Sequence, residues 1–243
     1  QDMMPGILNE AARYFQNANK IRKAIDLRIR LVAEHPDCEF VNDAQFSVAQ
    51  SWAQLAFFEK AADAYETFAR DHAAGRQADD RAPEAMLFAV DIRIGLGQDV
   101  QAKADADFLD QKFGSNHKYQ KLAAEAYFKV GELYTSTRDW QEVIRHYEDY
   151  IQKYGRKGGK EFEIRAMMWV AEAHWSLVDC TWDEDEDRQR QTRCRQHKTE
   201  AFDFATRANG LVDLPRFGDE AAEGESTENV DPAAVLAGRR EAT

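Results

Sequence analysis

The feature that most constrains this chain is a helical pattern that recurs about every forty residues. The block at residues 126–134 aligns without a gap with the block at residues 166–174, at an offset of 40 residues. A small residue, Gly131 or Ala171, occupies the same place in both blocks, where a neighbouring helix must approach closely. A repeat of this length predicts similar units stacked side by side, because one unit alone cannot bury its apolar face.

Each unit is expected to contain two helices joined by a short break. After the block at 126–134, a break at residues 137–139 precedes a stretch with Val143, Tyr147 and Tyr150 on one helical face. The position of Val143 in this second stretch has upstream equivalents at Ala24, Ala61 and Ala102. The four positions are spaced by 37, 41 and 41 residues. A last unit carries the same pattern at Ala201, Ala205 and Ala208, displaced by an insertion.

The unit at residues 124–155 resembles the tetratricopeptide repeat (TPR). The matching small and aromatic positions are Tyr127, Val130, Gly131, Tyr134, Val143 and Tyr147. Other units are degenerate, since Arg28, Ala106 and Ala205 replace the aromatic residue of the second helix. The resemblance implies an all-α fold, a right-handed α-solenoid of about five TPR-like hairpins over residues 1–216. The alternative is an irregular helical bundle.

In the TPR family, the second, fifth and ninth places of each first helix face the ligand. Carried over, the fifth places after Asn9 are Phe46, Leu87, Phe128 and Met168. The flanking second places are Asp43, Glu84, Glu125 and Arg165. The flanking ninth places are Gln50, Asp91, Glu132 and Glu172. The resemblance therefore implies an apolar row flanked by carboxylates, suited to a partner segment with apolar and basic residues and not to an acidic tail. Alternatively, the four apolar side chains pack between helices, and their solvent exposure distinguishes the two interpretations.

The insertion in the last unit, at about residues 180–198, contains five acidic residues (183–187) followed by five basic ones. It could extend both flanking helices and pair charges four residues apart, such as Glu184 with Arg188. Cys180 and Cys194 would then face each other and could form a disulfide, while two free thiols are the alternative. The acidic run lacks the glycine and the final glutamate of a calcium loop, so we expect no metal site there.

Composition and motifs argue against several function classes. The formal net charge is −12, with 32 Lys and Arg against 44 Asp and Glu, which disfavours a nucleic-acid ligand. No apolar run approaches the roughly 20 residues of a transmembrane helix.

No zincin, Rossmann or nucleophile-elbow motif is present, and the glycine-rich stretch 155–160 departs from a phosphate loop. His174 takes an aromatic core position and is expected to pack. We therefore expect no enzyme and no cofactor, although catalysis by scattered carboxylates stays open.

The C-terminal residues 217–243 form an acidic stretch that predicts a flexible tail with a short helix at 231–240. The chain begins with Gln1, so either a targeting segment was removed or the sequence is part of a longer chain.

The long repeats are similar in style to TPR proteins of the Gram-negative envelope, of the outer-membrane assembly lipoprotein and Tol–Pal coordinator types. That resemblance implies a protein-interaction scaffold in a multi-protein complex, periplasmic or associated with the outer membrane. The alternatives are a cytoplasmic TPR adaptor or chaperone-type peptide binder, and a helical accessory domain of a larger protein.

Overall fold

The computed structural model describes residues 3–178 and 188–212 of the chain. Within these residues the chain is helical, without strands, and a short 3-10 turn follows the eighth helix. The helices are α1 (Met4–Asn17), α2 (Ile21–Glu34), α3 (Val41–Gln54), α4 (Phe58–Asp71), α5 (Ala82–Gly95), α6 (Asp99–Phe113), α7 (Gln120–Thr137), α8 (Trp140–Lys153), α9 (Lys160–Ser176) and α10 (Arg188–Leu211).

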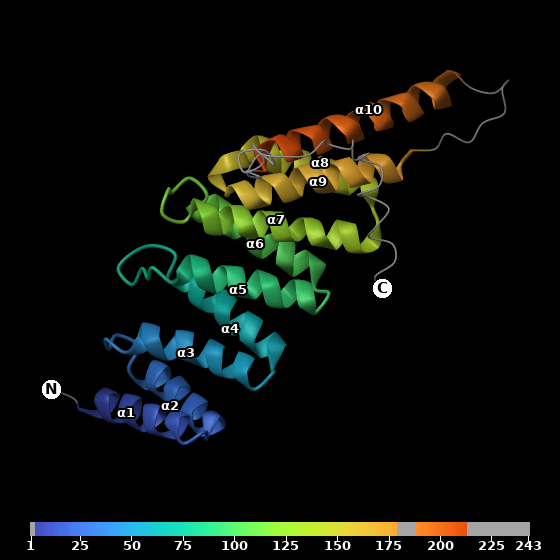
Figure 1. Cartoon of the computed structure of the whole chain (residues 1–243). Helices are drawn as coiled ribbons and strands as arrows, with labels where there is room; N and C mark the ends of the chain where they lie inside the picture. The colour runs from blue at the N-terminus through green and yellow to red at the C-terminus, as the bar shows by residue number, and fades with distance from the viewer. Residues whose placement is uncertain (1–2, 179–187, 213–243) are drawn as a thin grey trace, which may run out of the picture. The chain divides into compact units, whose positions relative to one another are not determined.

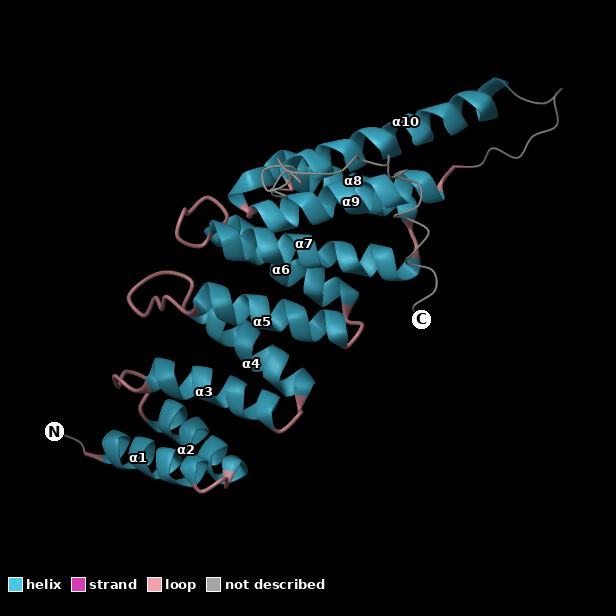
Figure 2. Cartoon of the chain, viewed as in Figure 1, coloured by secondary structure: helices cyan, strands magenta, loops and turns pink. Residues whose placement is uncertain are grey.

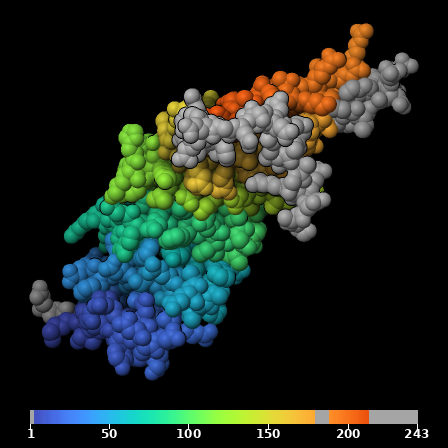
Figure 3. All heavy atoms as spheres, viewed as in Figure 1, coloured from blue at the N-terminus to red at the C-terminus, as the bar shows by residue number. Residues whose placement is uncertain are grey.

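Consecutive helices pair into five antiparallel hairpins, from α1 and α2 to α9 and α10 (Figures 1 and 2). Each helix packs mainly against the helices before and after it in the chain, and α5 also contacts α7. Successive hairpins form consecutive bands on the surface drawn in Figure 3. The predicted all-α solenoid of about five TPR-like hairpins is thus confirmed, and a bundle around one central core is not observed among these residues.

The chain divides into a compact unit of residues 1–211 and a second unit of residues 212–243. Only Val212 of the second unit is described, so the predicted tail helix at 231–240 lies outside the described residues.

The repeated small residues explain why the helices pair where they do. Ala24, Ala61, Ala102 and Val143 are each fully buried on the second helix of their hairpin. The residue four places further on is an aromatic ring in two of these hairpins, Tyr65 and Tyr147, and both rings are buried. A small residue lets the two backbones approach, and the large ring fills the space beside it.

Buried charges link three helices in the middle of the stack. The guanidinium of Arg93 on α5 donates to Asp105 on α6 at 2.9 Å and to Asp63 on α4 at 3.1 Å, and it also pairs with Glu66. Arg70 on α4 reaches Asp105 at 3.0 Å. This ion-pair network joins α4, α5 and α6.

The second part of the predicted insertion, from Arg188 onward, belongs to α10. The basic half of the insertion is therefore helical, and its acidic half lies outside the described residues. Cys194 is buried and disulfide-bonded, whereas Cys38 is a free thiol. Cys180 lies outside the described residues, so the Cys180–Cys194 pairing stays a prediction.

Candidate protein-binding surface

The fifth places of the first helices do not form an open apolar row. Phe46, Leu87 and Phe128 are 7%, 6% and 0% exposed, and only Met168, at 49%, reaches solvent. The Phe46 ring centroid lies 5.3 Å from that of Phe68 in its own hairpin. The packing alternative therefore holds for the three buried side chains, because the fifth place points into the layer between helices. Met168 alone keeps the predicted exposure.

Phe128 shows how this layer continues from one hairpin to the next. Its ring centroid lies 5.0 Å from that of Tyr147 in the same hairpin and 5.0 Å from that of Phe162 in the next one. A side chain that joins two hairpins in this way is part of the stacking interface, so it is unavailable to a partner.

Arginine side chains cover two of the buried rings. The Arg81 guanidinium lies 5.0 Å from the Phe46 ring centroid, and that of Arg165 lies 4.9 Å from the Phe128 ring centroid, in cation–π geometry. Arg81 also contacts Asp79 at 2.7 and 2.9 Å and Asp43 at 2.8 Å. These hydrogen bonds hold the pKa of the Asp79 carboxyl well below its usual range. Next to Phe46 the surface therefore presents the unpredicted cation Arg81 beside the predicted Asp43. Next to Phe128 it presents Arg165, the cation that the repeat pattern places there.

The predicted carboxylates fall into three groups, of which the first is Asp43, paired with Arg81. Asp91 and Glu125 share one cation, the Lys129 ammonium, at 2.8 and 3.0 Å, and burial raises the pKa of Asp91. Three further carboxylates are exposed and form no ion pair with another described residue: Glu84, Glu132 and Glu172. Among the predicted groove residues, these three offer a negative charge that no described residue neutralises, and the exposed Gln50 offers a neutral amide.

A groove of about 610 Å³ runs between the first and second hairpins. It contains the predicted residues Asp43, Phe46 and Gln50 of α3, and Asn9 of α1 at the matching place. The groove is polar, and its remaining lining is Arg13, Gln16, Asn17, Arg28, Phe40, Ser47 and Arg81. It is the place in the structure where predicted ligand-facing residues meet around an open space.

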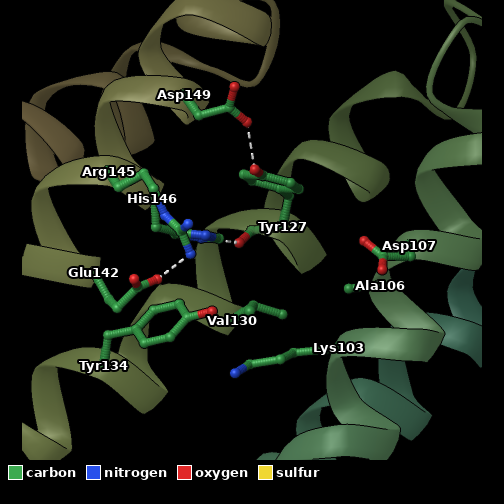
Figure 4. Close-up of a pocket in the computed structure, with 10 residues that line it drawn as sticks. All are labelled: Lys103, Ala106, Asp107, Tyr127, Val130, Tyr134, Glu142, Arg145, His146 and Asp149. Carbon is green, nitrogen blue, oxygen red and sulfur yellow. Dashed lines mark hydrogen bonds and ion pairs between the residues drawn. The ribbon is translucent and has the colours of Figure 1, made fainter. Parts of the chain in front are cut away.

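A second hollow, of about 380 Å³, lies among α6, α7 and α8 and contains none of the predicted groove residues (Figure 4). The Tyr127 ring stacks on His146 at 4.6 Å between centroids, and its hydroxyl donates to Asp149. Nε2 of His146 donates to the Tyr127 carbonyl at 2.8 Å, and burial lowers the pKa of this histidine. Arg145 pairs with Glu142. Since the tyrosine, the histidine and the Glu142–Arg145 pair already bind within the cluster, these side chains stabilise the fourth hairpin.

The structure also locates the other candidate residues. His174 is buried, stacked near Phe204, and contacts His197, as expected for a packed ring. Within residues 3–178 and 188–212, no group of three or more His, Cys, Asp or Glu side chains is placed to hold a metal ion. None of the helices described there is long and apolar enough to cross a membrane.

Sequence reasoning named Arg165 but missed three other cations of this surface, Lys129, Arg28 and Arg81. Lys129 could have been found, because it lies four residues after Glu125 on one helix and such pairs are neighbours. Arg28 stands out in the sequence as a replacement for an aromatic residue, which signals an unusual environment. Arg81 gives no such signal, because it lies before the first helix of the third hairpin and reaches back to the second.

Comparisons with known proteins identify the fold. No protein-family model matches the chain, and no curated protein matches it. The solved structure of MamA protein matches with a TM-score of 0.52 at 13% identity, over 86% of this chain and 92% of that one. At such identity the likeness extends to the fold alone.

Two further solved structures are similar at lower scores. A putative kinesin light chain of Podospora anserina with TPR-like repeats has 12% identity, coverage of 87% and 96%, and a TM-score of 0.48. A tetratricopeptide repeat protein from Parabacteroides merdae has 12% identity, coverage of 86% and 78%, and a TM-score of 0.45.

Proposed function

We propose that this chain is a non-enzymatic scaffold that holds segments of partner proteins within a multi-protein assembly. The observation that carries the proposal is the polar groove between α1 and α3, where ligand-facing places of two TPR-like hairpins meet. The hairpins beside it are joined by buried side chains, so the groove exists before a partner arrives. A pre-formed site loses little conformational entropy on binding, which favours affinity.

The exposed carboxylates suggest the chemistry of the partner. Glu84, Glu132 and Glu172 lie on the first helices of the third, fourth and fifth hairpins, without a bound cation among the described residues. Met168 on α9, at the fifth place of the same unit as Glu172, is 49% exposed and can add an apolar contact. We therefore propose that these hairpins bind a segment that carries basic and apolar residues, because opposite charges select the partner and buried apolar area adds affinity.

The test compares two triple charge reversals of equal size. One variant carries Glu84→Lys, Glu132→Lys and Glu172→Lys on the first helices. The control carries Asp26→Lys, Asp71→Lys and Glu148→Lys, exposed positions on the second helices α2, α4 and α8. Partners are captured from the source cells and cross-linked, and the cross-links are mapped by mass spectrometry.

We expect the first variant to lose its partner by about tenfold or more, and the control to retain it. The scaffold proposal is rejected if no partner is captured by the unmodified chain. The charge proposal is rejected if both variants bind equally, or if the cross-links map to the second helices.

We further propose that the assembly belongs to a bacterial cell envelope. The disulfide at Cys194 supports an oxidising compartment, since cytosolic proteins seldom keep such bonds. Mass spectrometry of the protein from its source cells, with and without reductant, is expected to show a bond between Cys180 and Cys194. Fully reduced thiols would instead favour a cytoplasmic adaptor or chaperone-type peptide binder.

A further inference from the structure

Arg28 is a buried cation with no counter-ion among residues 3–178 and 188–212. It lies on α2, is 5% exposed, and takes the place that holds Tyr65 or Tyr147 in other hairpins. Its Nη2 donates to the side-chain oxygen of Gln16, and its Nη1 lies 3.5 Å from the hydroxyl of Ser51. Both acceptors are neutral, and no carboxylate among the described residues pairs with Arg28. Burial lowers the pKa of this guanidinium, as expected where no anion compensates the lost hydration.

Arg93 shows how the same fold treats another arginine of equal burial. Arg93 is also 5% exposed, and it contacts three carboxylates. A buried charge is costly unless it is paired, so natural chains normally supply the anion, as this one does for Arg93. The described part of the chain supplies none for Arg28.

The Arg28 side chain lines the polar groove, so an external anion can reach it. Two other cations of the groove are already paired, Arg13 with Glu10 at 2.7 Å and Arg81 with Asp43 and Asp79. Of the three arginines that line the groove, Arg28 is therefore the one with no anion in the part of the chain that the structure describes, and it is the one most removed from water. A charge-assisted hydrogen bond is strongest at such a desolvated position.

We propose that Arg28 forms the floor of a subsite that binds an acidic side chain, Asp or Glu, of the partner segment. The inference rests on the proposed scaffold function and adds a second recognition element to it. The small exposure of Arg28 favours a side chain over a chain terminus. A carboxylate on a side-chain stem reaches the floor while the partner's backbone stays in the groove, whereas a terminal carboxylate would bring the backbone down with it.

The subsite would also fix the direction of the partner. The partner segment would carry an acidic residue where it contacts the first two hairpins. It would carry basic residues where it contacts Glu84, Glu132 and Glu172, so its two ends would have opposite charges. A reversed segment would place like charges together at both ends, which disfavours it.

The experiment uses the end-blocked heptapeptide Lys-Ala-Leu-Glu-Leu-Ala-Lys, the same peptide with Gln at its centre, and the Gln peptide with a free C-terminus. Binding to the full chain is measured by calorimetry or by NMR titration. The key variant is Gln16→Glu, which converts the existing neutral acceptor of Arg28 into a carboxylate of nearly the same shape. Arg30→Met, on the exposed side of α2 and outside the groove, is the control.

We expect the unmodified chain to bind the Glu peptide at least about tenfold more tightly than the Gln peptide, the effect of one charge-assisted hydrogen bond. Gln16→Glu should abolish this preference and raise the unfolding temperature, because the internal carboxylate takes the place of the partner's. Arg30→Met should keep the preference.

The proposal is overturned if the Glu and Gln peptides bind equally or neither binds, or if the preference survives in Gln16→Glu. Tighter binding of the free C-terminal peptide than of the Glu peptide would assign the site to a chain terminus and overturn the side-chain assignment. None of these results affects the capture experiment above, so failure of the subsite is distinguishable from failure of the scaffold function.

Discussion

At Gly131 the backbone of α7 lies directly against the ring of Tyr147 on α8. A Cβ atom at this position would lie 2.8 Å from Cε1 of that ring and closer still to its Cζ and hydroxyl. Because Tyr147 is fully buried, it has no room to move aside. We expect Gly131→Ala to destabilise the fold by about 1–3 kcal/mol through overpacking, measured by urea unfolding.

Gly6→Ala is the matched control for this substitution. Gly6 also lies within a helix, α1, and an added Cβ meets nothing within 4 Å. There the substitution should stabilise the fold by about 0.5–1 kcal/mol, because alanine loses less backbone entropy in a helix. Equal effects at both sites would show that packing against Tyr147 is not what requires Gly131.

At the residue scale, the sequence predicts burial better than it predicts function. The predicted positions of the small and aromatic residues in the helix contacts are correct, because the helical period alone decides which face of a helix meets its neighbour. The groove places are less well predicted, since Phe46, Leu87 and Phe128 are core residues. Whether a fifth-place side chain points into solvent or into the stack depends on the tilt between hairpins, which a repeat pattern does not encode.

At the scale of elements, Arg93 determines how α4, α5 and α6 hold together. Asp105 is 1% exposed, and Arg93 and Arg70 are its cations. Burial raises the pKa of Asp105 to about 6 even with both arginines present. Without Arg93 the carboxylate would lose the attraction that opposes burial. We expect Arg93→Met to destabilise the fold by about 3–5 kcal/mol in urea unfolding.

Two further variants distinguish a broken buried pair from a general loss of packing. Asp63 contacts the same guanidinium, but its side chain is 71% exposed, so Asp63→Ala should cost less than about 1 kcal/mol. The double variant Arg93→Met with Asp105→Leu should be more stable than Arg93→Met alone, because no buried charge is left unpaired. A double variant as unstable as the sum of its parts would contradict this account.

The contact between α9 and α10 makes stability depend on pH. Nδ1 of His174 lies 2.9 Å from Nδ1 of His197, and burial, followed by the charge of His197, lowers the pKa of His174. An unfolded histidine has a pKa of about 6.5, so in mildly acidic solution the unfolded chain binds more protons than the folded one. The stability of this contact is therefore complete above about pH 6.5 and is lost as the pH falls below it.

We expect the unfolding temperature of the unmodified chain to fall between pH 7.5 and 5.5 by more than that of His174→Phe. The comparison cancels other groups with shifted pKa values, such as His146 and Asp105, because both proteins contain them. An identical pH dependence in the two proteins would show that His174 does not carry the effect.

The hairpins could be predicted from the sequence, but the ion pairs between them could not. Hairpin positions follow from the spacing of Ala24, Ala61, Ala102 and Val143, which is local information. Arg81 and Asp43 are 38 residues apart and meet only after two hairpins have stacked. The charges that the surface exposes therefore depend on ion pairs that no helical period predicts. For this reason the prediction of a groove flanked by carboxylates is only partly correct.

At the scale of the whole helical unit, two clusters contain most of the buried apolar residues. The larger runs from Phe46 to Ala208, and the smaller contains Leu8, Leu31, Val41 and Ala44 around the first hairpin. The first hairpin meets the rest of the stack through α2 and α3. In a repeat array each hairpin is stabilised mainly by its neighbours, so a hairpin with one neighbour and a small cluster is the first to open.

Native-state hydrogen exchange tests this distribution of stability. We expect amides of α1 and α2 to exchange through local opening, at a lower free energy than amides of α5 and α7. Leu31→Ala, at a fully buried position, should speed exchange in α1 and α2 and leave α7 unchanged. Gln16→Glu should slow exchange in the same hairpin, because it supplies Arg28 with an anion. Uniform protection along the chain would mean that the hairpins unfold as one cooperative unit, with the first one as stable as those in the middle.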